Sequence, residues 1–357
     1  MWGMIRYIVL AMAVVAVGLG GCSTSAVDDG SYPMGVMLPA KGVGAAASAE
    51  VVRGMELACG EINAAGGLDG IPLKLLVRDS STFLESFESL RRAGARVLSV
   101  GFGRECIAQK AFLSKRDDVF VNFMCTYPPA TLDMPNATRI FLNGAQAGDI
   151  MAKAVARGED RDVRLVVMNV DDYFGKADAD YLSFDLKLDR TKLYRDVFGA
   201  EERDFDIFAS QIMRLDADCV FYVGYGDSLD AFVSALARTG YGKKIVANCG
   251  IAASKIPAPK GVELCIVETD FARGTLGGEK TRAFVSAYRA KYGTEPTWLA
   301  AYGYDSVRML ADAARKSRFN PSKMRDCFRN TSYEGAAGKI EFDNSADSLS
   351  QISLVKR

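Results

Sequence analysis

Few side chains in this sequence could perform catalysis. Asp227 and Ser228 stand side by side in the string Gly-Asp-Ser-Leu, which places an acid next to a possible nucleophile. A serine needs a general base to attack a substrate, and histidine is the usual base because its pKa lies near neutral pH. The chain of 357 residues contains 0 histidines. We therefore expect a protein that is not an enzyme.

A glycine-containing turn offers a different chemistry, the binding of an anion. Gly101 and Gly103 follow an apolar run, and a helical pattern begins at Glu105. The third glycine of a dinucleotide-binding fingerprint is missing, so we expect no nucleotide cofactor. Backbone N–H groups at a helix start attract anions, and Arg104 could hold a carboxylate or phosphate with two parallel hydrogen bonds. An exposed arginine at the rim of a cleft is the open alternative for Arg104.

The cysteines predict neither a metal site nor a disulfide framework. The chain has 8 cysteines, and without Cys22 an odd number is left, so these cannot all pair internally. Their spacing is irregular and no CxxC motif occurs, so we expect most of them to be small buried hydrophobic residues. They are Cys59, Cys106, Cys125, Cys219, Cys249, Cys265 and Cys327.

Composition and length bound the class of protein. The chain is 49% hydrophobic and 25% charged, as soluble globular proteins are, and it exceeds the roughly 100–200 residues of one domain. Lysine plus arginine and aspartate plus glutamate both number 44, so no basic field would attract a nucleic acid. We expect two domains and no nucleic-acid partner.

Apolar runs alternate with helical patterns along the chain, which predicts parallel sheets covered by helices. Strands are expected at 34–38, 73–77, 97–101 and 119–123, with helices at 83–93 and 105–113. The alternation restarts after residue 143, with strands at 164–170, 219–223, 245–247 and 263–267 and helices beginning at 147 and 175 and covering 205–215 and 228–238. Two lobes of the same α/β architecture are predicted.

Residues 51–77 form a helix, a stop and a strand. Val51, Met55 and Ala58 share one helix face, and Gly66 and Gly67 then end the helix. The segment E-I-N-A-A-G-G-L-D-G-I-P-L-K-L resembles the signature of solute-binding proteins related to the leucine/isoleucine/valine-binding protein, the type I periplasmic binding proteins of ABC transporters. The segment A-Y-G-Y-D-S-V-R-M-L-A-D-A resembles a late helix of that family.

This resemblance implies a fold of two Rossmann-like lobes with parallel sheets joined by a three-crossover hinge. The helices expected at 280–292 and 299–315 would return to the first lobe, and the last strand, at 352–355, would join the second. On that basis the first lobe covers 33–143 plus 268–346, and the second covers 144–267 plus 347–357.

The resemblance also implies a ligand held at turns of the first lobe. In amino-acid-binding relatives, the turn matching Gly103, Arg104 and Glu105 carries small hydroxyl residues that hold the ligand carboxylate. The next turn contains Cys125 and Thr126, and Thr126 keeps the hydroxyl group that relatives use. We expect Thr126 to form a hydrogen bond with the ligand, and Cys125 beside it could instead be simply buried.

The second lobe would contribute an aromatic wall. Tyr173 and Phe174 match the family's acidic-x-Tyr-Gly turn, with Phe174 where a ligand-stacking tyrosine stands, and Tyr225 is a second candidate. Plain core residues are the alternative for these rings. Asn248 and Cys249 follow another expected strand, and Cys249 stands where branched-chain binders have an acid that neutralises the ligand ammonium.

The loss of that acid predicts a ligand other than a simple α-amino acid, because a buried ammonium group needs a carboxylate partner. Glu105 and Asp227 are the acidic residues that could replace it.

The N-terminus resembles an export signal. Arg6 precedes an apolar run at 7–19, and Leu-Gly-Gly-Cys at 19–22 is similar to a bacterial lipobox, so residues 1–21 would be the signal peptide and 22–32 a tether. A lipid on Cys22 would anchor the protein to a membrane on the extracytoplasmic side of the cell envelope. A signal-anchor helix is the alternative.

Together these features predict a lipid-anchored solute-binding protein of an ABC uptake system. It would be a monomer without cofactor or metal that captures a small polar or anionic solute (amino-acid-like, amide or carboxylate) and presents it to permease subunits. The alternative is a sensing module of the same fold that signals to a membrane partner.

Overall fold

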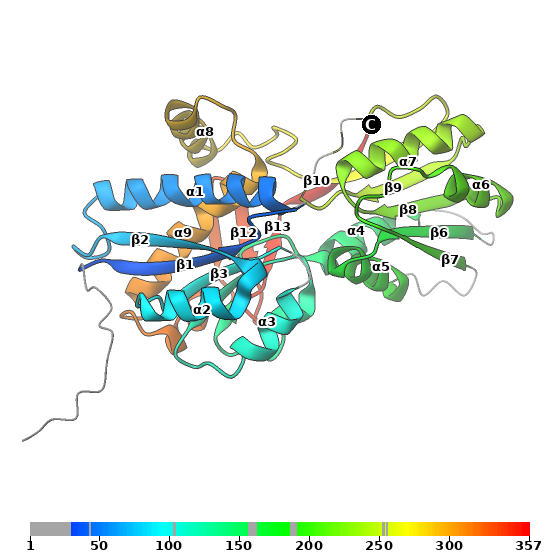
Figure 1. Cartoon of the computed structure of the whole chain (residues 1–357). Helices are drawn as coiled ribbons and strands as arrows, with labels where there is room; N and C mark the ends of the chain where they lie inside the picture. The colour runs from blue at the N-terminus through cyan, green and yellow to red at the C-terminus, as the bar shows by residue number, and fades with distance from the viewer. Residues whose placement is uncertain are drawn as a thin grey trace, which may run out of the picture.

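The computed structural model describes residues 30–42, 44–102, 105–155, 163–185, 191–251, 254 and 256–357. The predicted signal peptide and Cys22 lie outside these residues. Two α/β lobes stand side by side and are joined in the middle (Figure 1).

The first lobe is built on a parallel sheet with the strand order β2-β1-β3-β4-β5. Its strands are β1 (Tyr32–Leu38), β2 (Leu73–Asp79), β3 (Val97–Gly101), β4 (Phe120–Met124) and β5 (Ala137–Thr138). The helices between them are α1 (Gly44–Ala64), α2 (Phe83–Arg92) and α3 (Glu105–Leu113). The predicted alternation of strands and helices is confirmed for this lobe.

Two late helices, α8 (Glu279–Tyr292) and α9 (Trp298–Lys316), return to the first lobe and pack on α1. Glycine makes the close approach of α1 and α9 possible. A Cβ on Gly54 would lie 1.9 Å from the Ala300 carbonyl oxygen, and one on Gly303 would lie 2.2 Å from that of Val51. Both glycines therefore serve the packing of α1 against α9.

The second lobe has the strand order β14-β10-β9-β8-β6-β7. All its strand pairs are parallel except that of β10 with β14. The strands are β6 (Val163–Val170), β7 (Thr191–Phe198), β8 (Cys219–Val223), β9 (Lys244–Asn248), β10 (Glu263–Thr269) and β14 (Ile352–Lys356). The helices are α4 (Gly144–Val155), α5 (Tyr173–Asp185), α6 (Asp206–Arg214) and α7 (Gly226–Thr239).

The strand β7 was not expected from the sequence. It lies at the edge of the sheet, and Lys192, Arg195 and Asp196 interrupt its apolar residues. An edge strand faces solvent and tolerates such charges, so it lacks the apolar run that marks a buried strand.

A small antiparallel sheet, β11 (Ser332–Gly335), β12 (Gly338–Phe342) and β13 (Ser348–Ser350), completes the chain before β14. The chain passes between the lobes after β5, after β10 and between β13 and β14, which confirms the three-crossover hinge. The residue-level lobe boundaries stay a prediction.

Candidate ligand-binding site

A cleft of about 590 Å³ opens between the lobes, where the carboxyl ends of strands from both sheets face each other. One wall comes from the segments that follow β1, β3 and β4, and the other from those that follow β6, β7, β8 and β9. Open α/β sheets bind their ligands at this edge, because the loops there are free to vary while the sheet holds them in place.

Aromatic and apolar side chains dominate the cleft, as in most small-molecule sites. The aromatic lining residues are Phe102, Tyr127, Phe141, Phe174 and Tyr225. The charged lining residues among those that the structure describes are Lys41, Asp171 and Asp172.

The first-lobe wall is centred on the turn after β4. Cys125, Thr126 and Tyr127 all line the cleft, and Cys125 is buried. The Thr126 carbonyl oxygen accepts a hydrogen bond of 2.8 Å from the backbone N–H of Gly144, the first residue of α4. This wall is therefore tied directly to the start of the second lobe.

Phe102 also belongs to this wall and was missed by sequence reasoning. Its φ angle is 56°, in the left-handed region that few bulky residues adopt, and its ring lies 5.7 Å from that of Phe141. Its N–H donates to the Met124 carbonyl oxygen at 3.2 Å. A backbone conformation of this kind is common at ligand sites but leaves no mark in the residue pattern.

The second-lobe wall is an aromatic pair fixed by an acid. The rings of Phe174 and Tyr225 lie 5.9 Å apart, and the Tyr225 hydroxyl donates to Asp172 Oδ2 at 2.7 Å. Burial and the neighbouring Asp172 raise the pKa of Tyr225, so its hydroxyl stays a donor. A Cβ on Gly250 would lie 2.8 Å from the Phe174 ring, so a larger residue at this position would collide with the ring.

The structure places the predicted residues unevenly. Cys125, Thr126, Phe174 and Tyr225 line the cleft from opposite lobes. Gly103 and Arg104 lie outside the described residues. Glu105 begins α3 and Tyr173 begins α5, and the placement of their side chains also lies outside the described part of the structure.

Asp227 does not line the cleft. It lies in the first turn of α7, is exposed, and forms an ion pair with Arg203. The neighbouring Ser228 is buried, and its hydroxyl hydrogen-bonds to the Tyr222 hydroxyl at 2.5 Å and donates to the Tyr225 carbonyl oxygen at 3.0 Å. Ser228 therefore ties the first turn of α7 to Tyr222 and Tyr225.

Asn248 and Cys249 line a second, smaller cavity of about 60 Å³. Thr126 and Gly250 line both cavities, so the second one adjoins the cleft. Burial raises the pKa of the Cys249 thiol to about 12, so its side chain carries no charge near neutral pH.

Asp178 on α5 is an acid that sequence reasoning missed. It is 1% exposed, and its Oδ2 accepts a 2.6 Å hydrogen bond from Asn248 Nδ2. Its Oδ1 has no hydrogen-bond partner among the described residues and lies 2.6 Å from where a Cβ on Gly144 would be. Burial raises the pKa of Asp178 to about 8. The signal in the sequence was its position four residues after Phe174 on the same helix.

Comparison with known proteins places this architecture. The sequence profile of the family described as periplasmic binding protein matches residues 31–351. An amino acid binding protein of Pseudomonas aeruginosa is 24% identical over 366 residues, covering 95% of this chain and 92% of that protein. The Leu/Ile/Val-binding protein homolog 1 of Brucella abortus is 21% identical over 324 residues, covering 88% and 86%.

Solved structures share the fold. The branched-chain amino acid substrate-binding protein LivJ of Streptococcus pneumoniae, solved with isoleucine, has a TM-score of 0.73 at 21% identity and covers 92% of this chain and 100% of that one. A solute-binding protein of Rhodopseudomonas palustris, solved with 3,4-dihydroxybenzoic acid, has a TM-score of 0.74 at 16% identity and covers 92% and 93%.

The fold is that of a type I periplasmic binding protein. The chain belongs to the periplasmic binding protein family, as its sequence resemblance predicted. Its relatives are solute-binding proteins.

Proposed function

We propose that this protein is the extracytoplasmic solute-binding component of an ABC uptake system, anchored by lipid on Cys22. The observation that carries the proposal is the cleft of about 590 Å³, whose walls come from the strand ends of both lobes. A ligand in such a cleft contacts both walls, so it favours the closed arrangement of the lobes by its higher affinity for that state. The closed form would then be recognised by permease subunits.

The described lining favours a small organic carboxylate or amide with a flat or apolar body. The rings of Phe174 and Tyr225 offer a stacking surface, and Thr126 offers a hydroxyl group. Cys249 carries no charge, and both oxygens of Asp172 already accept hydrogen bonds, from Tyr225 and from the backbone N–H of Gly175. The third acid at the cleft, Asp171, is paired with Lys176, so a ligand ammonium group would lack a carboxylate reserved for it.

Relatives support this range of ligands. The LivJ structure holds isoleucine and the Rhodopseudomonas structure holds 3,4-dihydroxybenzoic acid, so one fold serves both aliphatic amino acids and aromatic acids. Of these two ligand classes, the aromatic walls and the uncharged Cys249 favour the aromatic acids for this chain.

The extracytoplasmic location and the lipid anchor rest on the N-terminal sequence. Among the helices of the described ranges, none combines the length and the hydropathy that a membrane span requires. Metabolic labelling with a radioactive fatty acid, with Cys22→Ser as the control variant, tests the anchor. Incorporation that persists in Cys22→Ser would contradict it.

The ligand is best sought by mass spectrometry of small molecules released from the purified protein. A thermal-shift panel of aromatic acids, aliphatic amino acids and amides then follows. We expect at least one aromatic acid to raise the melting temperature, and Phe174→Ala to weaken its binding about tenfold, the scale of a lost aromatic contact. A panel without a single stabilising compound would overturn the proposal.

A further inference from the structure

Arg139 is a fully buried charge behind the cleft. It follows β5, where the chain first passes toward the second lobe, and its exposed fraction is 0%. It does not line the cleft. Burying a guanidinium group is costly unless it is paired and its N–H groups are hydrogen-bonded. The hydrogen-bond partners of Arg139 therefore indicate which part of the structure its charge stabilises.

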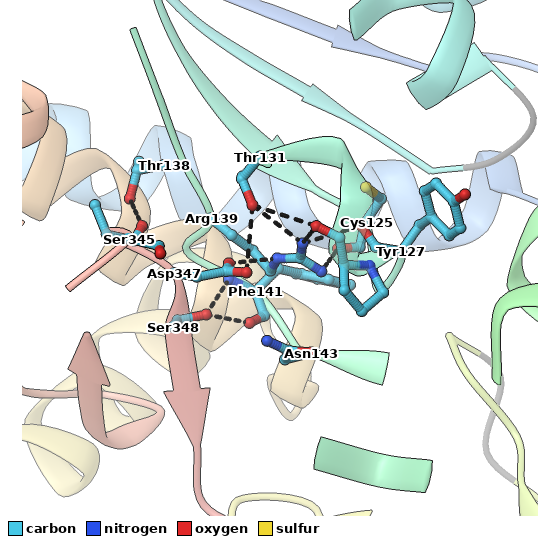
Figure 2. A network of polar contacts seen from close by, with 12 residues as sticks. Cys125, Tyr127, Thr131, Thr138, Arg139, Phe141, Asn143, Ser345, Asp347 and Ser348 are labelled. Atoms are coloured by element: carbon cyan, nitrogen blue, oxygen red, sulfur yellow. Dashed lines mark hydrogen bonds and ion pairs between the residues drawn. The ribbon is translucent and has the colours of Figure 1, made fainter. Parts of the chain in front are cut away.

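The guanidinium group is hydrogen-bonded to the backbone of the turn after β4, which lines the cleft. Nη1 donates to the Cys125 carbonyl oxygen at 3.0 Å, and Nη2 donates to the carbonyl oxygens of Tyr127 and Pro128, both at 2.9 Å. Figure 2 shows the guanidinium facing this backbone while the Tyr127 ring points away from it. The turn thus presents its carbonyl groups to Arg139.

The segment just before β13 holds the guanidinium from its other edge. Arg139 Nε donates to Asp347 Oδ1 at 2.6 Å, and Asp347 Oδ2 accepts from the Thr131 hydroxyl at 3.2 Å. Just before it, the Ala346 carbonyl oxygen accepts from the Thr138 hydroxyl at 2.6 Å. The ion pair therefore rests on two segments that already bind each other.

We propose that Arg139 is a positioning residue for the ligand site: its planar fork, fixed by Asp347, sets the conformation of the turn that presents Cys125, Thr126 and Tyr127. This role rests on the proposed function only in that the turn is a wall of the ligand cleft. Three backbone carbonyl groups on a single turn match the geometry of guanidinium, which has five donors in one plane. A lysine at this position would keep the charge but would lack the planar group of N–H donors that binds several carbonyl oxygens at once.

The test is hydrogen–deuterium exchange of the purified protein without ligand, comparing the wild type with Arg139→Lys. The reporting amides are those of Ala130 and Met134, which donate within the turn region to the carbonyl oxygens of Tyr127 and Thr131. We expect these amides to exchange at least tenfold faster in Arg139→Lys. The amides of β3 should keep their wild-type rates.

Arg308→Met is the matched control. Arg308 is a partly buried arginine of the same lobe that pairs with Glu61, away from the turn. We expect this variant to leave the exchange of Ala130 and Met134 unchanged. If Arg139→Lys yields no folded protein, Asp347→Glu, which keeps the charge but moves the carboxylate relative to the guanidinium, carries the same test with a smaller acceleration.

Two outcomes overturn the proposal. Wild-type exchange in the turn of Arg139→Lys would show that the fork does not hold it, and equal acceleration in β3 would show a general loss of stability. The experiment needs no ligand. A failure to find any solute would therefore count against the proposed function alone.

Discussion

The two walls of the cleft are supported by buried polar groups of opposite kinds. Behind the first-lobe wall, Arg139 and Asp347 form an ion pair. Behind the second-lobe wall, Asp178 is hydrogen-bonded to the neutral Asn248, and the charged group that acts on it among the described residues is another acid, Asp172. One wall rests on paired charges, the other on an acid that burial keeps protonated up to about pH 8.

The difference predicts how each support fails. Burial raises the pKa of Asp347, but the Arg139 guanidinium acts in the opposite direction and favours the carboxylate. Removing one partner there leaves a buried charge. Asp178 is protonated in the native structure, so its contribution to stability is lost when the pH rises and the proton dissociates.

The largest expected effect comes from breaking the ion pair. Asp347→Ala leaves Arg139 buried and unpaired, which should lower the free energy of unfolding by about 3–5 kcal/mol. Urea denaturation followed by circular dichroism measures it. The double variant Arg139→Met with Asp347→Leu should recover part of that loss, because no charge remains buried although the carbonyl groups of the turn lose their donor. A double variant no more stable than Asp347→Ala would show that shape, not charge, sets the cost.

The next effect concerns Asp178 and depends on pH. Its pKa is about 8 in the folded protein, above the ordinary value of 3.8, so the folded state binds the proton more tightly than the unfolded chain. This stabilisation is complete below about pH 4 and is lost as the pH rises through 8. Asp178→Asn should therefore match the wild type at pH 4 and exceed its stability at pH 9 by a few kcal/mol, on the scale of ~1.4 kcal/mol per pKa unit.

Thermal denaturation of both proteins from pH 4 to pH 9 checks this expectation. Burial also raises the pKa of Asp305, on α9, to about 7, so the wild type and Asp178→Asn share part of the same pH dependence. The informative quantity is the difference between the two proteins. A difference that does not grow with pH would mean that Asp178 is ionised at neutral pH.

The smallest effect is expected at Asp227, which supports neither wall. Its ion pair with Arg203 is exposed, and such pairs contribute roughly 0–1 kcal/mol. Asp227→Ala should change neither the melting temperature nor the affinity for a ligand of the thermal-shift panel. Isothermal titration beside Phe174→Ala makes the comparison. A tenfold loss of affinity would place Asp227 at the ligand after all.

The order of strands and helices could be predicted from the sequence because it depends on local patterns. Apolar runs of strand length marked β3, β4 and β8, and the glycines at 66 and 67, both at positive φ, ended α1 as expected. The edge strand β7 was not predicted, because its solvent-facing charges interrupt the apolar run that marks a buried strand. The turns after the strands were also predictable sites, since parallel strands end at one edge of a sheet.

Which side chains reach or support the cleft at each turn was decided by the tertiary structure. Phe102 reaches the cleft through its left-handed backbone, and Asp178 becomes a neutral acid only because α5 buries it. Arg139 and Asp347 stand 208 positions apart, and only the return of the chain to the hinge brings them together. Sequence determined the fold and the family, because local periodicity and glycine positions encode them. The support of the binding site depends on burial and distant contacts, which arise only once the lobes have folded.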